Sequence, residues 1–218
     1  MTEIEIEIAT IDFIKNTLKN AEAGHDWFHI ERVWKNALTI AKEEKGNVFI
    51  ITLAALLHDI ADSKFNNGDE EIGPLKAKVF LQSISVPEAI VLHVENIIRH
   101  ISFKGGNFAS TFYSPELAVV QDADRMDAMG AIGIARAFAY GGYKNRELYN
   151  PSIEPDLAMA KDAYKNSNAP TINHFYEKLL FLKDTMNTKT GKQMAAQRHL
   201  FMETFLAQFY VEWEGEKL

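Results

Sequence analysis

The sequence predicts an all-α fold in a single domain. Apolar residues recur at helical spacing over long stretches, and helix-capping residues flank those stretches. No convincing strand alternation occurs beyond the first few residues. The 218 residues, 47% of them apolar and 24% charged, suffice for one large domain or two small ones. We therefore expect one helical bundle spanning residues 1–218.

The first helix predicted with a clear start follows Gly24. Asp26 is a suitable N-cap residue, apolar residues such as Ile30 and Val33 recur at helical spacing, and Gly46 closes the segment. The next segment, 47–62, is apolar nearly all round. This pattern is typical of a helix that is buried on every side.

Two later helices are predicted from Ser-Pro-Glu patterns. Ser85 precedes Glu88 by three residues with a proline between them, which predicts a capping box and a helix running towards Phe103. Ser114 similarly opens a helix with the sequence ELAVVQDADRMDAM.

The remaining chain contains a lid and two helices. Residues 141–170 are polar and interrupted by glycine and proline, which predicts a long loop or lid with room for one short helix. Helices are expected at about 172–186 and 190–213, separated by the turn-prone stretch NTKTG.

Composition and charge narrow the function classes. There is no cysteine, so a metal site would need nitrogen and oxygen ligands. A net charge of -7 argues against binding long nucleic acids, while a small phosphorylated ligand stays compatible. The N-terminus does not resemble a signal peptide, and no apolar stretch approaches the ~20 residues of a membrane span. We expect a cytoplasmic protein, either a monomer or a small homo-oligomer.

Polar residues interrupt the apolar run at LLHDIADSKF. Burying an unpaired carboxylate costs several kcal/mol, so these groups should bind a metal or a basic partner such as Lys64. A histidine on the preceding helix and aspartates on a later one could complete a His, His, Asp, Asp set. These residues are His29 and Asp122, Asp124 or Asp127. Spacing alone does not choose among the three aspartates.

Several blocks of sequence in order resemble the HD-domain superfamily of metal-dependent phosphohydrolases. They are HDWFHIERV, LLHDIADSKF, ISFKGG, QDADRMDAMGAIGIARAF and AAQRHLFMETFLAQF, and they look most like a bacterial subgroup of YpgQ-like nucleotide pyrophosphatases. The resemblance covers most of residues 22–212. It implies a metal-binding helical core at about 22–140, a lid at about 141–170 and C-terminal helices at about 172–213.

The resemblance also implies the metal ligands. They are His29, His58, Asp59 and Asp124, where Asp124 is chosen because it matches the alanine-aspartate pair of the family motif. Mn²⁺ is the expected ion, with Mg²⁺, Fe²⁺, Co²⁺ and Ni²⁺ as alternatives. Some branches of the superfamily hold two metals with two further histidines. His93 and His100 lie in the corresponding interval, although their spacing does not match that pattern.

Catalysis would then follow from a metal-activated water that attacks phosphorus. We assign Asp62 to proton transfer or water orientation and Lys64 to charge neutralisation, with a salt bridge between them as the structural alternative. Lys104, Arg125 and His100 are candidate substrate-binding residues.

Three further basic residues have no single assignment. Arg136, Lys178 and Arg198 fit structural roles, phosphate contacts or a solvated helix face equally well.

The expected reaction is hydrolysis of a nucleoside triphosphate to a monophosphate and pyrophosphate. A nucleotidase or cyclic-nucleotide phosphodiesterase of the same superfamily is the alternative enzyme. A non-catalytic, metal-stabilised helical binding module and a helical scaffold without metal are alternatives from other classes.

Overall fold

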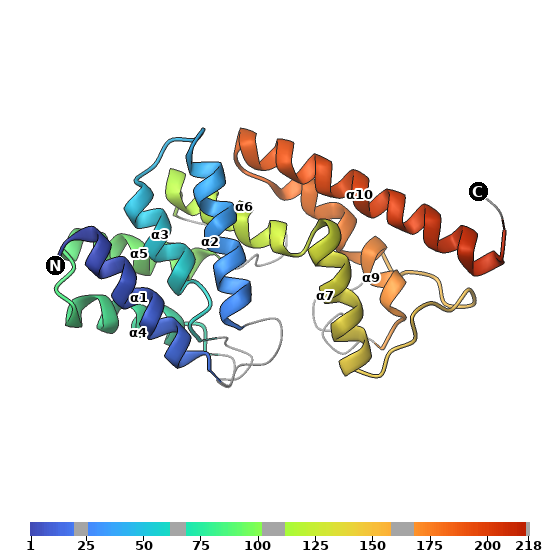
Figure 1. Ribbon diagram of the computed structural model, residues 1–218, viewed down its shortest axis with the longest axis horizontal. Coiled ribbons are helices and arrows are strands. Elements are labelled where there is room, and N and C mark those ends of the chain that lie inside the picture. The colour runs from blue at the N-terminus through green and yellow to red at the C-terminus, as the bar shows by residue number, and fades with distance from the viewer. Residues whose placement is uncertain (20–25, 62–68, 102–111, 158–167, 217–218) are drawn as a thin grey trace. The chain divides into compact units, whose positions relative to one another are not determined.

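The computed structural model describes residues 1–19, 26–61, 69–101, 112–157 and 168–216. The regular structure of these residues is helical, with no strand among them, which confirms the all-α prediction. In chain order the elements are α1 (Glu3–Thr17), α2 (Trp27–Ala41), α3 (Val48–Leu57), α4 (Ile72–Ser83), α5 (Glu88–His100), α6 (Pro115–Asp127), α7 (Gly130–Tyr143), α9 (Thr171–Glu177), the 3-10 helix η2 (Leu179–Thr185) and α10 (Lys189–Glu214) (Figure 1). No described helix combines the length and apolarity that crossing a membrane requires.

The chain forms two compact units, Met1–Asp124 and Arg125–Leu218. Helix α3 forms the core of the first unit and packs against α1, α2 and α5. Eight of its ten residues are buried, which confirms the helix predicted from the apolar run. Each buried leucine or isoleucine contributes about 1.5–3 kcal/mol relative to exposure, so the C-terminal end of α3 is firmly placed.

Helix α2 begins as predicted at Asp26. The Asp26 carboxylate accepts a hydrogen bond from the backbone N–H of His29 at 2.9 Å, which caps the first turn. His29, Ile30, Val33, Ala37 and Ile40 form its buried face. The cap and this buried face together orient His29 towards the interior.

The first few residues form helix α1, although their alternation of acidic and apolar residues is typical of a strand. Thr2 and Glu5 form a reciprocal capping box at the start of this helix. Ile6, Thr10 and Ile14 are buried at intervals of four residues, so the helical period determines which side chains face the core.

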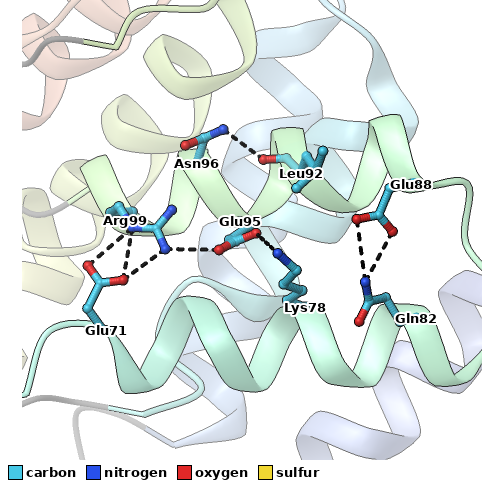
Figure 2. A network of polar contacts seen from close by, with 8 residues as sticks. All are labelled: Glu71, Lys78, Gln82, Glu88, Leu92, Glu95, Asn96 and Arg99. Atoms are coloured by element: carbon cyan, nitrogen blue, oxygen red, sulfur yellow. Dashed lines mark hydrogen bonds and ion pairs between the residues drawn. The ribbon is translucent and has the colours of Figure 1, made fainter.

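Helix α4 had no counterpart among the predicted elements. It packs against α5, and Figure 2 shows the ion pairs between the two helices. Arg99 donates to Glu71 at 2.8 Å and to Glu95 at 2.9 Å, while Lys78 pairs with Glu95 at 3.0 Å. Glu95, whose side chain is 12% exposed, therefore connects Lys78 of α4 to Arg99 of its own helix.

The capping box predicted at Ser85 is wrong. The N-cap of α5 is Pro87, and no side chain caps it. Ser85 has a φ of 59° and its backbone N–H donates to the carbonyl of Gln82, because it belongs to the turn that ends α4. Glu88 instead accepts a hydrogen bond from the Gln82 side chain at 3.1 Å. The prediction at Ser114 is confirmed, since its hydroxyl accepts from the N–H of Leu117 at 3.0 Å.

The second unit contains α7, α9, η2 and α10. The predicted helix at 172–186 is divided into α9 and η2 at Lys178, whose φ of -146° is not helical. Helix α10 agrees with the prediction at 190–213: Thr188 caps its start, and Gly215, with a φ of 69°, ends it. Phe175 and Met202 are fully buried in this unit.

Helix α7 extends into the segment expected to be a lid. It continues through Gly141 and Gly142 to Tyr143. Because Gly141 has no side chain, α7 can pack closely against α9 at this point. A Cβ atom at Gly141 would lie 2.1 Å from the hydroxyl oxygen of Thr171. Residues 144–157 form turns without a helix, and positions 158–167 of the expected lid lie outside the described residues.

We expect Gly141→Ala to lower the free energy of unfolding by about 1–3 kcal/mol, because the new methyl group forces α7 and α9 apart. Gly142→Ala is the matched control, since a Cβ there would meet nothing within 4 Å. The control should be neutral or stabilising by up to about 1 kcal/mol, given the higher helix propensity of alanine. Urea denaturation of both variants measures the difference. Equal stabilities would contradict the proposed close contact.

Candidate metal centre

Four of the predicted site residues meet in the first unit. His29 comes from α2, His58 and Asp59 directly follow α3, and Asp124 lies on α6. His29 Nε2 lies 3.6 Å from Asp124 Oδ1 and 4.0 Å from Asp59 Oδ2. His58 Nε2 lies 3.8 Å from the same oxygen of Asp124, and the two imidazole rings are 5.3 Å apart. Three helices therefore bring two imidazoles and two carboxylates together.

The backbone contact of His58 selects the tautomer of its ring. Its Nδ1 atom lies 2.8 Å from the carbonyl oxygen of Ala55. Because a carbonyl oxygen can only accept, Nδ1 carries the proton, and in the neutral ring Nε2 has a free lone pair. That Nε2 atom is buried and has no hydrogen-bond partner among the described residues. A buried acceptor of this kind, oriented by a bond to its other ring nitrogen, is the usual state of a histidine that binds a metal.

The spacing of the donor atoms fits a single divalent ion. One ligand atom from each of His29, His58 and Asp59 lies within 4.8 Å of the others. A metal–ligand distance of ~2.1 Å places neighbouring ligand atoms ~3–4 Å apart. A small inward movement of these side chains would therefore bring all the ligand atoms to bonding distance of one ion. The histidines are 3% and 9% exposed, whereas the side chains of Asp59 and Asp124 are 19% and 39% exposed. The carboxylate side is therefore the accessible one.

The three candidate aspartates of α6 have different environments. Asp124 is the one found beside the histidines. Asp127 is 1% exposed and pairs with Arg136 at 2.7 Å, and Asp122 is fully buried. Asp127 therefore has a cationic partner of its own.

Two predicted substrate-binding residues make structural contacts. His100 donates from Nδ1 to the carbonyl of Asn96 at 2.8 Å and packs against Phe112. Arg125 donates to the carbonyl of Thr185 in the second unit. Asp62, Lys64 and Lys104 lie outside the described residues, so their assigned roles stay predictions.

The unassigned basic residues differ in their surroundings. Arg136 donates to the side chain and the backbone carbonyl of Asp127, and Arg198 donates to the carbonyl of Met126 at 2.6 Å. Both arginines therefore stabilise the end of α6. Lys178 is exposed at the break between α9 and η2.

A second polar cluster lies around Glu116 in the first unit. The sequence did not predict it, because the pattern Ser114-Pro115-Glu116 indicates only a helix start. Glu116 is 8% exposed and accepts from the backbone N–H of Asn47 at 2.8 Å. His93 Nε2 lies 3.3 Å from Glu116 and 3.1 Å from the hydroxyl of Ser114. Asn47 also caps α3, so Glu116 connects the start of α3 to α6. His93 belongs to this cluster, and within the described residues it is not part of the group with metal-binding spacing.

The Glu116 cluster should make stability depend on pH. Burial alone would raise the pKa of Glu116, but hydrogen bonds from Asn47 and Ser114 and attraction to His93 outweigh it and hold the pKa below its ordinary 4.5. A depressed carboxyl pKa stabilises the folded state above pH 4.5, and this contribution is lost as the pH falls through the folded-state pKa.

We therefore expect Glu116→Gln to cost about 1–2 kcal/mol of unfolding free energy at neutral pH, and progressively less at acidic pH. Urea denaturation at several pH values measures the difference from the unsubstituted protein. The exposed Glu88→Gln variant serves as a control and should change stability by less than about 0.5 kcal/mol. A deficit that does not change with pH would show that ionisation of Glu116 is unimportant.

The helical fold and the cluster of histidines and aspartates are shared with a known protein family. Residues 27–129 match the HD domain family. The protein YpgQ of Bacillus subtilis is 37% identical over 206 residues, which cover 93% of this chain and 91% of YpgQ. The chain therefore belongs to the HD-domain superfamily of metal-dependent phosphohydrolases.

Solved structures agree over the full length. A crystal structure of an HD-superfamily hydrolase from Bacillus thuringiensis has a TM-score of 0.80 and 46% identity, covering 99% of this chain and all of that one. Bacillus subtilis YpgQ, crystallised in complex with ADP, has a TM-score of 0.77 and 32% identity over the aligned structures, covering 97% of each chain. These similarities confirm the family expected from the sequence blocks.

Proposed function

We propose that this enzyme hydrolyses a small nucleotide, converting a nucleoside triphosphate to a monophosphate and pyrophosphate. The ion would be held by His29, His58, Asp59 and Asp124. The observation that carries the proposal is the buried Nε2 lone pair of His58, directed at a cluster of ligand atoms. The ADP complex of YpgQ supports a nucleotide substrate. We expect the enzyme to act in the cytoplasm.

The residues of the proposed site fall into three groups: metal ligands, a proton acceptor and phosphate-binding residues. A divalent cation held by His29, His58, Asp59 and Asp124, Mn²⁺ in the first instance, would lower the pKa of a bound water and polarise a phosphoryl oxygen. His29 and His58 are buried, so their imidazole rings are held in fixed orientations. Asp59 and Asp124 are more exposed and would face the side from which the substrate approaches. Asp62 would accept the proton from the attacking water. Lys64 and Lys104 would bind the phosphates and neutralise charge that develops on them. Arg125 and His100 each donate to a backbone carbonyl, so they would contact a phosphate only in addition to those bonds.

The test is hydrolysis of a panel of nucleoside triphosphates, monophosphates and cyclic nucleotides with added Mn²⁺. Pyrophosphate and orthophosphate are measured separately. We expect pyrophosphate from triphosphates. Orthophosphate from monophosphates would indicate a nucleotidase, and opening of cyclic nucleotides a phosphodiesterase. Metal binding without any turnover would indicate a binding module and would contradict the proposal.

A further inference from the structure

The second unit contains a cavity with no assigned role. It has a volume of about 410 Å³ and lies between residues 149–157 and the helices α9 and α10. Its size falls in the range of small-molecule sites, ~300–1,000 Å³. None of its lining residues belongs to the His-Asp cluster or to residues 27–129, which match the HD domain. The phosphohydrolase site therefore does not account for it.

Three tyrosines form the aromatic part of the cavity wall. They are Tyr149, Tyr176 and Tyr210. The ring of Tyr149 packs edge-to-face against Tyr210 at 5.4 Å and against Trp213 at 5.0 Å. Tyr210 also hydrogen-bonds to Tyr176. Because neighbouring rings and this hydrogen bond restrict their rotamers, the tyrosine rings are held in place before any ligand binds.

The charge of the cavity favours a cation. Glu154 is the acidic residue of the lining, and no lysine, arginine or histidine is among the described lining residues. Burial and the hydrogen bond to Tyr176 raise the pKa of Tyr210, and the negative charge of Glu154 acts in the same direction. Glu154 is therefore close enough to influence the tyrosines. A phosphate or carboxylate ligand would meet repulsion from Glu154 and would find no cationic partner among the lining residues that the structure describes.

The amides of the lining already have structural partners. Asn173 donates to the carbonyl of Ile153 at 2.9 Å. Asn150 donates to Glu147 at 2.8 Å and accepts from the N–H of Ser152 at 3.0 Å. Recognition of a polar, many-donor ligand would have to break these bonds. The other walls include Pro151 and Pro155, which suit a ligand with an apolar surface.

We infer that this cavity binds a small quaternary ammonium cation, whose methyl groups contact Tyr149, Tyr176 and Tyr210 and whose charge lies near Glu154. Tyrosine faces attract such cations through the ring quadrupole, and a nearby carboxylate adds direct attraction. The inference is independent of the proposed nucleotide hydrolysis, because it rests on a different unit of the chain.

The first experiment compares choline with its neutral isostere dimethylbutanol by isothermal titration calorimetry on the full chain. The two probes have nearly the same shape, so their difference reports the charge. We expect choline to bind at least about tenfold more tightly. Equal binding of the two probes, or no binding of choline at millimolar concentrations, would overturn the inference.

The second experiment locates the site with substitutions. Glu154 is exposed to solvent at the cavity, so Glu154→Gln should fold normally and weaken choline binding by about five- to tenfold. Glu214→Gln, an exposed change on α10 outside the lining, is the matched control and should bind choline like the unsubstituted protein. Tyr149→Leu should weaken binding by a similar factor. Unchanged affinity of Glu154→Gln would refute the site even if choline binds elsewhere.

Discussion

His58→Gln is expected to lose bound metal and to reduce phosphohydrolase turnover by more than about a hundredfold. Even outer partners of metal ligands contribute ~10–100-fold, so the loss of a direct ligand should exceed that range. Glutamine keeps a polar side chain near Ala55 but cannot offer an imidazole lone pair to the ion that Asp59 and Asp124 would share. The metal content of the purified protein and the rate of nucleotide hydrolysis measure the two effects.

His93→Gln is the matched control, since His93 is a half-buried histidine that contacts Ser114 and Glu116. It should retain bound metal and most of its activity. Thermal melting provides a third measurement: chelation should lower the melting temperature of the unsubstituted protein and leave that of His58→Gln unchanged, because a ligand that binds the folded state stabilises it. Full metal occupancy in His58→Gln would show that this histidine is not a ligand.

Local patterns predicted the elements that carry this site. The uniformly apolar run predicted α3 because every side of that helix is buried, and Asp26 predicted the start of α2 because a cap acts within one turn. These signals do not depend on distant parts of the chain. The histidines at the ends of both elements were accordingly recognisable from the sequence.

Elements that depend on distant contacts were predicted poorly. Helix α4 begins at Ile72 without a side-chain cap and has a glycine, Gly73, in its first turn, so its local start signal is weak, and it packs against α5. Ser85 fits a capping pattern, yet the turn after α4 determines its conformation. Tertiary contacts therefore override the local preference in both places.

The aspartates of α6 illustrate the same limit within the site. Asp124 and Asp127 are three residues apart on one helix, so their spacing from the histidines in sequence is nearly equivalent. What distinguishes them is Arg136, which pairs with Asp127 from the following helix. Only the family motif could select Asp124 before this pairing was known.

The pairing of Asp127 leads to the largest expected effect on stability. Asp127 is 1% exposed, and its carboxylate accepts from Arg136, whose side chain is 29% exposed. Burial lowers the pKa of Arg198, and the charge of Asp127 opposes that shift. Removal of the carboxylate thus deprives two partly buried guanidinium groups of the negative charge of Asp127.

We expect Asp127→Ala to lower the unfolding free energy by about 2–4 kcal/mol, somewhat below the ~3–5 kcal/mol of a fully buried pair because Arg136 is partly solvated. Since domains are stable by only ~5–15 kcal/mol, this loss should be evident in urea denaturation. Asp184→Ala, an exposed aspartate of the same unit, should change stability by less than about 0.5 kcal/mol.

A second substitution distinguishes loss of charge pairing from loss of packing. Arg136→Met in the Asp127→Ala background removes the guanidinium group that has lost the Asp127 carboxylate and should recover part of the lost stability, whereas Arg136→Met alone should be destabilising. If the two changes were additive, the ion pair would not be the source of the effect. Additivity would instead indicate that each side chain stabilises the end of α6 through its own backbone and packing contacts.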